Sequence, residues 1–145
     1  MSTDLRPTVL LVEDSPFWSQ LVADALAELP AAYAVHLLNV EDGTGALAAL
    51  GGEHVLVAVI LDICLPGPMS GLDILDTIRH ADKPWIAHLP VAMFTTSPSG
   101  LDIARAKVLG VDRYIAKTVE LNGIAQLQML LRGFVVAVIE REHHA

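Results

Sequence analysis

Five polar side chains with complementary chemistry come directly after short apolar runs of the sequence. They are three carboxylates, a hydroxyl and an ammonium, carried by Glu13, Asp14, Asp62, Thr95 and Lys117. Three carboxylates close together repel one another unless some stay protonated or a divalent cation neutralises them. All-oxygen ligands favour a hard cation, and one or two carboxylates with several waters favour Mg²⁺. With an ammonium and a hydroxyl around one carboxylate, this chemistry predicts phosphoryl transfer, with that carboxylate as the nucleophile that becomes an aspartyl phosphate.

An alternation of strand and helix signals positions these side chains. Apolar, partly β-branched runs predict five strands, over residues 8–12, 34–40, 55–61, 90–94 and 112–116. Helical spacing and helix start signals predict five helices, beginning near residues 16, 44, 70, 99 and 120. Five β–α repeats predict an α/β domain with a doubly wound parallel sheet and helices on both faces. Ligands of such sheets bind outside the carboxyl ends of the strands, so we expect the five side chains to converge on one crevice.

The composition narrows the classes of protein that fit. With 145 residues, 53% of them hydrophobic, the chain predicts a single domain, residues 1–145, with its core over about 7–131. The formal net charge of −8 speaks against nucleic acid as a ligand, because phosphate backbones are bound by clusters of Lys and Arg. A single cysteine, Cys64, excludes an internal disulfide and a cysteine-based zinc site. Neither a signal-peptide pattern nor a run of about 18 apolar residues is present, so we expect no membrane span and a cytoplasmic protein.

Four short motifs carry a family resemblance. The stretches LLVEDS, VILDICLP, VAMFTTS and DRYIAKT occur in this order and resemble the four signatures of response-regulator receiver domains of the chemotaxis type. The resemblance covers nearly the whole chain and implies the flavodoxin-like receiver fold, a five-stranded sheet of order 2-1-3-4-5 with five helices. It implies a single-domain response regulator of a two-component phosphorelay, phosphorylated by a histidine kinase or phosphotransfer protein and signalling to a downstream protein. It implies no enzyme activity beyond self-catalysed phosphorylation and hydrolysis of the aspartyl phosphate.

The same resemblance assigns a role to each site residue. Asp62 matches the phosphoacceptor. The family's Mg²⁺ ligands correspond to the carboxylates of Glu13, Asp14 and Asp62 and to the backbone carbonyl of Cys64. Thr95 and Lys117 match the residues that bind the phosphoryl group. Tyr114 matches the switch aromatic, which turns inward when Thr95 moves towards the phosphoryl group, and its face then changes its protein contacts.

One departure from the family pattern concerns the residue after the lysine. Thr118 stands where the family usually has a proline, preceded by a peptide bond that is often cis. A cis Lys117–Thr118 bond would cost about 3 kcal/mol, so the loop is either trans or strained. The position of Lys117 therefore stays open at this point. So does the alternative of a degenerate receiver that acts through protein contacts without phosphorylation.

Two other classes of protein share this architecture. A hydrolase of the haloacid-dehalogenase kind needs a second acid two residues after its nucleophile, and Cys64 stands there. A flavodoxin-like FMN binder needs a hydroxyl- and glycine-rich phosphate loop after the first strand. The sequence EDSPF in that loop does not supply it. Both classes fit the residues less well than a receiver does.

The predicted last helix, residues 120–141, is longer than a closing receiver helix needs. Its apolar stripe at helical spacing comprises Leu127, Leu130, Leu131, Phe134, Val135, Val138 and Ile139. We expect its first half to pack on the sheet and its second half to project beyond it as the interface of a homodimer. The alternative is that the second half folds back on its own domain. The FTTS motif and this tail also resemble stand-alone receivers that partner phytochrome-type sensor kinases and tend to dimerise through this face.

Overall fold

The computed structural model describes residues 6–96, 99–118, 120 and 122–144. Its centre is one parallel sheet of five strands in the order β2-β1-β3-β4-β5, which confirms the predicted order. The strands are β1 (Thr8–Val12), β2 (His36–Val40), β3 (Leu56–Leu61), β4 (Val91–Thr96) and β5 (Arg113–Lys117). In this order β1 and β3 are neighbours in the middle of the sheet, whereas β5 forms an edge.

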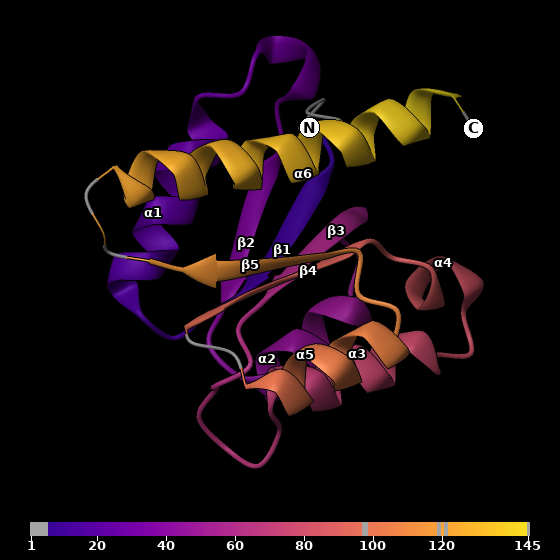
Figure 1. Cartoon of the computed structure of the whole chain (residues 1–145). Helices are drawn as coiled ribbons and strands as arrows, with labels where there is room; N and C mark the ends of the chain where they lie inside the picture. The colour runs from indigo at the N-terminus through magenta and orange to yellow at the C-terminus, as the bar shows by residue number, and fades with distance from the viewer. Residues whose placement is uncertain (1–5, 97–98, 119, 121, 145) are drawn as a thin grey trace.

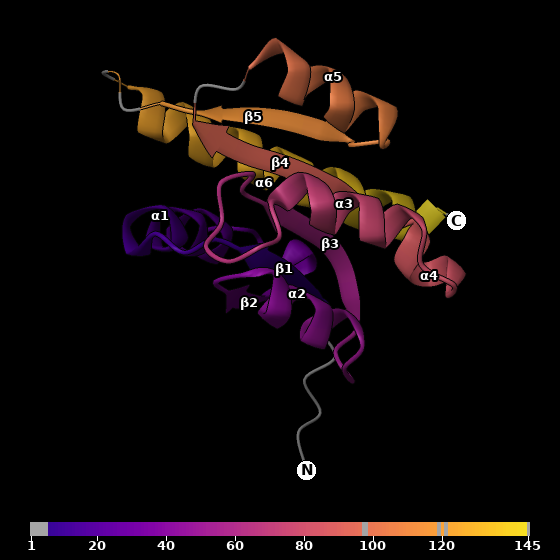
Figure 2. The ribbon, with the colours of Figure 1, turned by 90° about the horizontal axis from the view of Figure 1, so that it is seen from below.

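Helices cover both faces of the sheet. They are α1 (Pro16–Ala27), α2 (Gly43–Leu50), α3 (Gly71–Arg79), α4 (Pro84–Ala87), α5 (Gly100–Val108) and α6 (Gly123–His144), with a short 3₁₀ turn, η1 (Ala31–Tyr33). Figure 1 shows α1 and α6 on one face and α2, α3 and α5 on the other. The view from below in Figure 2 shows the same two layers, with α4 beyond the end of α3. The doubly wound α/β class is therefore confirmed.

The strands are buried on both faces, as their continuous apolar runs predicted. In β1, Val9 and Leu11 face α1 and α6, whereas Leu10 and Val12 face α2 and α3. All four side chains are at most 1% exposed. Successive strand residues point to opposite faces, so each central strand contributes to two separate apolar cores.

Four helices begin at a polar side chain that accepts a backbone hydrogen bond. These N-caps are Ser15 of α1, Asp42 of α2, Ser70 of α3 and Ser99 of α5. Ser70 and Asp73 also form a reciprocal capping box at the start of α3. The caps define where each helix leaves the carboxyl edge of the sheet, because an N-cap satisfies amides that have no partner within the helix.

The helix α4 and the turn η1 were not among the five predicted helices. Pro84 opens α4, where its fixed backbone angle suits the first turn of a helix. Arg79 holds the segment by donating to the carbonyls of Ala87 and Leu89, at 3.0 and 2.7 Å, and pairs with Asp112 at 3.2 Å. Elements of three or four residues are too short for a helical period, so the sequence pattern gave no sign of them.

The second half of α6 does not project from the domain, and the predicted core of about 7–131 was too short. Phe134, Val135, Val138 and Ile139 are at most 5% exposed and belong to the core beneath α1 and α6. These extra turns pack against side chains of η1 and of the strand beginnings, among them those of Tyr33, Val35 and Val57. The helix thus folds back on its own sheet, the alternative to a projecting interface.

Several polar contacts attach α6 to the neighbouring elements. The Tyr33 hydroxyl donates to the Glu140 carboxylate, and Arg132 pairs with Glu28 beyond the end of α1 at 3.3 Å. By length and composition alone, Gly123–Glu142 would be apolar enough to cross a membrane. Apart from Leu130, the residues of its apolar stripe are instead buried in the core between α6, α1 and the sheet, which is typical of a core helix.

Candidate functional site

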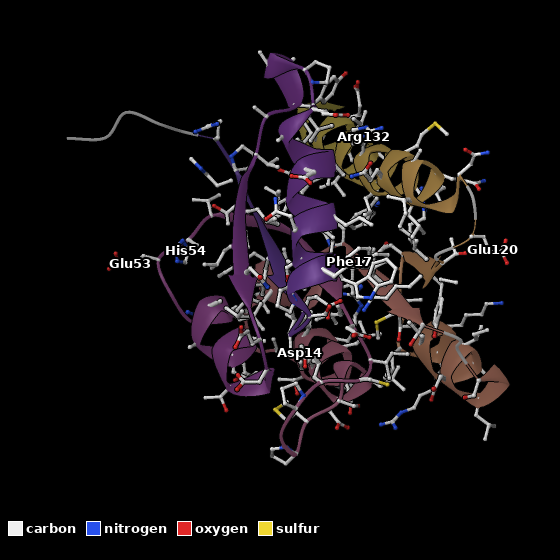
Figure 3. The ribbon with its side chains drawn as sticks, turned by 90° about the vertical axis from the view of Figure 1, so that its left-hand side faces the viewer. Asp14, Phe17, Glu53, His54, Glu120 and Arg132 are labelled. Carbon is white, nitrogen blue, oxygen red and sulfur yellow. The ribbon has the colours of Figure 1, made fainter. Side chains whose placement is uncertain are left out.

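Three carboxylates meet at the carboxyl edge of the sheet. Val12 and Leu61 are paired in the β1–β3 register, so Glu13, Asp14 and Asp62 follow the two strands at the same level. One oxygen of each carboxylate lies within 4.8 Å of the others. Glu13 and Asp62 are buried, whereas Asp14 is exposed in the loop that enters α1 (Figure 3). This cluster can hold a hard metal ion while leaving part of its coordination shell to water or a ligand.

Lys117 reaches the cluster from the edge strand. Its ammonium lies 2.5 Å from Glu13 Oε1 and 3.0 Å from Asp62 Oδ2, and its side chain is 3% exposed. The long side chain has to cross the end of β4, which lies between β5 and β3. Every peptide bond between described residues is trans, the bond from Lys117 to Thr118 included. The threonine therefore does not keep the lysine away from the acids.

Burial dominates the electrostatics of Glu13. It raises the pKa of this carboxyl above its ordinary value, and repulsion from Asp62 acts in the same direction. The ammonium of Lys117 and the Ser15 N–H, which donates to Glu13 Oε2 at 3.2 Å, oppose the rise. The charged form of Glu13 is thus costly here unless a cation accompanies it. A metal ion beside the three acids would add to what Lys117 already supplies.

A close backbone approach fixes the position of Asp62. Its N–H donates to the carbonyl of Val12 at 3.1 Å, and its Oδ1 accepts from the Cys64 N–H at 3.3 Å. At the start of α3, the Gly71 N–H donates to the Ile63 carbonyl at 2.9 Å. A Cβ added to Gly71 would lie 2.1 Å from the carbonyl oxygen of Asp62, so no larger residue fits without movement.

The remaining predicted site residues lie on β4 and β5. Thr95 is 1% exposed and pairs with Ala116, one position before the level of Lys117. Tyr114 packs against the core on the α2–α3–α5 face, and its buried hydroxyl has no hydrogen-bond partner among the described residues. Burial, followed by repulsion from Asp102 and Asp62, raises the pKa of Tyr114 to about 12. The ring therefore already lies inward. For Cys64, whose side chain is exposed, the predicted metal-binding carbonyl stays a prediction.

Two aromatic residues near Lys117 were missed by the sequence interpretation. The ammonium lies 5.2 Å from the ring centroid of Trp18 and 5.3 Å from that of Phe94. The two rings meet edge to face, with centroids 5.5 Å apart. A signal was available, because Trp18 follows the acidic pair on the first turn of α1 and Phe94 directly precedes Thr95.

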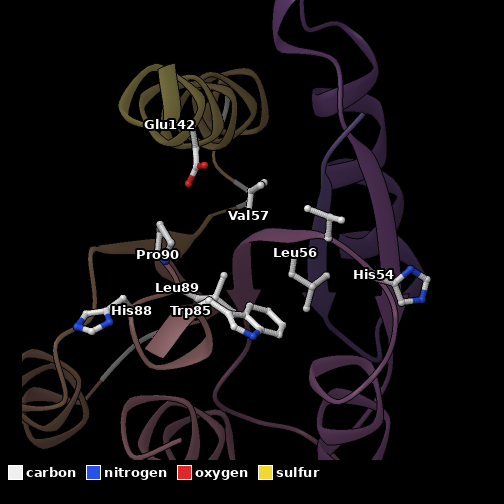
Figure 4. A pocket seen from close by; sticks show the side chains of 9 residues that line it. His54, Leu56, Val57, Trp85, His88, Leu89, Pro90 and Glu142 are labelled. Atoms are coloured by element: carbon white, nitrogen blue, oxygen red, sulfur yellow. The ribbon is translucent and has the colours of Figure 1, made fainter. Parts of the chain in front are cut away.

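A separate hollow lies at the opposite edge of the sheet. It measures about 530 Å³, with Trp85 and His88 from the α4 segment and Leu56 and Pro90 from the strand beginnings among its lining. Figure 4 shows the Glu142 carboxylate of α6 directed towards it. The acids and Lys117 lie at the carboxyl ends of the strands, so this hollow takes no part in their chemistry.

Comparison with known proteins identifies the family. The chain matches the response regulator receiver domain over residues 9–128, and it belongs to that family. It is 31% identical over 134 residues to the probable transcriptional regulatory protein TcrX of Mycobacterium tuberculosis (strain H37Rv). That match covers 92% of this chain and 53% of TcrX, so the chain spans about half the length of this curated relative.

Two of the similar solved structures are response regulators, one of them a phytochrome response regulator. The phosphorylated cyanobacterial phytochrome response regulator RcpA is 27% identical, with a TM-score of 0.75. The Mn²⁺-bound response regulator Rcp1 is 28% identical, with a TM-score of 0.72. Each match covers 88% of this chain and 90% of the other. The likeness agrees with the subgroup indicated by the FTTS motif and the tail.

Replacing Gly71 by alanine tests the close approach that positions Asp62. The added methyl group has to displace the Asp62 carbonyl, so we expect the free energy of unfolding to fall by about 2 kcal/mol in urea denaturation. Gly100→Ala is the matched control, because Gly100 also follows a serine N-cap and nothing lies within 4 Å of its added Cβ. Equal losses in the two variants would contradict this account.

Replacing Tyr114 by phenylalanine removes a buried hydroxyl without a described partner. We expect a free energy of unfolding higher by about 1 kcal/mol. Folding raises the pKa of Tyr114 from 10.0 to about 12, so the free energy of unfolding is independent of this group below pH 10 and falls as the pH rises from 10 to about 12. Stability measured over that range should therefore fall less steeply in Tyr114→Phe.

Tyr33→Phe is the control for this change. The Tyr33 hydroxyl donates to Glu140, so the same substitution removes a hydrogen bond and should lower stability at neutral pH. Opposite signs are expected for the two tyrosines of the chain. A stability loss in Tyr114→Phe equal to that in Tyr33→Phe would show that the Tyr114 hydroxyl has a partner.

Proposed function

We propose that the chain is a response regulator of a two-component phosphorelay in which Asp62 accepts a phosphoryl group from a histidine kinase or phosphotransfer protein. The observation that carries the proposal is the 3.0 Å contact between Lys117 Nζ and Asp62 Oδ2 inside an acidic cluster able to hold a metal ion. A carboxylate beside a buried ammonium and a metal is suited to attack phosphorus, because both cations offset charge on the phosphoryl oxygens.

Each side chain has a defined task in this proposal. Asp62 is the nucleophile, held in place by the hydrogen bond from its N–H to Val12 of β1 and by the close approach of Gly71 at the start of α3. Lys117 moves from its carboxylate partners towards the new phosphoryl oxygens. The Thr95 hydroxyl also moves towards these oxygens. Mg²⁺, held by the carboxylates of Glu13, Asp14 and Asp62, would supply the divalent charge. The cluster fits this ion, because it offers hard oxygen ligands and one exposed side.

The face built by α5, β5 and α6 would change its contacts with a downstream protein after phosphorylation. Tyr114 sits on β5 at the inner side of this face, and its hydroxyl lacks a described partner, so its inward position is held by packing alone. On α5, Leu101 and Val108 are 84% and 86% exposed, which suits a protein contact. Phosphorylation would shift the balance of this face by its different interactions with the two arrangements.

The predicted location, ligands and oligomeric state belong to the same proposal. We propose a cytoplasmic protein that binds no nucleic acid and has no enzyme activity beyond its own phosphorylation and dephosphorylation. The homodimer through α6 stays a prediction with less support, since most of the stripe is buried. Among the described large apolar side chains of α6, those of Met129 and Leu130 are exposed.

A degenerate receiver without phosphorylation is the alternative reading of the sequence. It depended on Thr118, whose replacement of proline left the position of Lys117 open. The trans bond and the two ion pairs of Lys117 support the phosphorylated function instead. Hydrolase chemistry with Asp62 as nucleophile has no support from Cys64, which offers no acid.

Intact mass spectrometry after incubation with phosphoramidate or acetyl phosphate and Mg²⁺ tests the proposed function. We expect one phosphoryl adduct on the wild-type chain and none on Asp62→Asn, because the amide is not a nucleophile for phosphorus. Asp76→Asn, at a half-exposed aspartate on α3, should keep the adduct. An unmodified wild-type chain with every donor, or an adduct retained by Asp62→Asn, would contradict the proposal.

A further inference from the structure

The ammonium of Lys117 has two kinds of neighbour. The carboxylates of Glu13 and Asp62 are within hydrogen-bond distance, and the rings of Trp18 and Phe94 lie just above 5 Å away. Both centroid distances are within the range in which a cation is attracted by the negative face of an aromatic ring. The aromatic pair is therefore part of the electrostatic surroundings of the lysine as well as part of the core.

Trp18 is firmly placed at the start of α1. Its backbone N–H donates to the Ser15 hydroxyl oxygen at the N-cap, at 3.4 Å. Its ring packs edge to face on Phe94 from inside and on Phe17 from outside, with centroids 5.5 and 5.0 Å apart. The indole thus has little freedom to move away from Lys117.

The two kinds of contact behave differently when the lysine moves. A hydrogen bond to Glu13 or Asp62 depends on a short distance and on direction. Attraction to a ring face falls off more gently, so it persists while the ammonium shifts from a carboxylate to a phosphoryl oxygen. Because the Lys117 side chain is 3% exposed, such attraction is stronger than at an exposed position. The rings can stabilise Lys117 before, during and after phosphorylation.

We propose that Trp18 is a positioning residue for Lys117, whose indole face holds the ammonium in line with the oxygens of Asp62 and thereby sets the rate of phosphorylation. This inference rests on the proposed function, since it concerns the step at Asp62. Trp18 never touches the phosphoryl group. It acts through Lys117, and the ring of Phe94 contacts the same ammonium as a second aromatic neighbour.

Fluorinated tryptophan separates this electrostatic role from simple packing. Fluorine withdraws electrons from the ring face with little change in size, so it weakens the attraction to a cation and leaves packing nearly intact. The chain has two tryptophans, and Trp85→Phe leaves Trp18 as the single position for the analogue. In that background, phosphorylation by phosphoramidate with Mg²⁺ should slow stepwise with each added fluorine, by about fivefold in total.

Two further variants complete the rate measurement. Trp18→Phe keeps a smaller aromatic face and should retain more activity than Trp18→Leu. The matched control carries Trp18→Phe with Trp85 retained, so that the analogue enters only position 85 on α4, where fluorine should not alter the rate. A rate that is independent of fluorine at position 18, with unchanged unfolding, would overturn the proposal.

An NMR readout reports the contact without any phosphorylation. In protein labelled at the lysine ε-carbons, Lys117 is one of three signals and is assigned by its absence in Lys117→Arg. Ring currents from Trp18 should displace its ε-proton signal, and Trp18→Leu should return it towards those of Lys83 and Lys107. An undisplaced signal in the wild type would overturn the proposal by itself. A displaced signal with a fluorine-independent rate would overturn the positioning role and leave the proposed function standing, whereas a wild type that accepts no phosphoryl group would overturn both.

Discussion

The pairing of one buried ammonium with two buried carboxylates is the interaction on which the arrangement of the site depends. Lys117 from β5 contacts Glu13 after β1 and Asp62 after β3, so a single cation joins the ends of three strands. Burying charges is costly, and the cost is offset only when good geometry and further hydrogen bonds accompany the pair. Burial raises the pKa of Glu13 above its ordinary value, and the neighbouring Lys117 ammonium acts against that rise. The site is therefore prepared for additional positive charge.

The fold supplies the geometry that this pairing requires. The 2-1-3-4-5 order makes β1 and β3 neighbours, so their terminal acids meet without any long side chain. The lysine has to come from farther away, and its length is matched to the position of β5 at the edge. Gly71 allows α3 to approach the Asp62 backbone closely, and the aromatic rings of Trp18 and Phe94 close the site on the side of α1. Acids held by the strand ends, together with a lysine long enough to change its hydrogen-bond partner, suit a site that accepts and releases one charged group.

Much of this could be predicted from the sequence, for identifiable physical reasons. Alternating strand and helix signals, together with the rule for parallel strand ends, predicted that Glu13, Asp14, Asp62 and Lys117 converge. The strand order came from the resemblance of four motifs to a family rather than from periodicity. The position of Lys117 beside Thr118 could not be predicted, because a single residue type does not determine how the loop relaxes around it.

The features that were missed share a cause. The stripe of α6 has the same spacing whether it covers a partner or its own sheet, so the pattern could not show that Val135 and Ile139 are buried. That outcome depends on η1, a three-residue turn with no periodic signal. The role of Trp18 likewise depends on a contact across 99 positions of sequence, from 18 to 117, which no local pattern contains.

A double-mutant cycle on the buried ion pairs tests the central claim most directly. Without divalent cations, Lys117→Met leaves two buried carboxylates uncompensated and should lower the free energy of unfolding by about 3 kcal/mol. In a Glu13→Gln/Asp62→Asn background, the same substitution should cost less than about 1 kcal/mol, because no buried charge is then left unpaired. An equal cost in both backgrounds would contradict the account, since it would show that Lys117 stabilises the fold by packing and not by holding these acids.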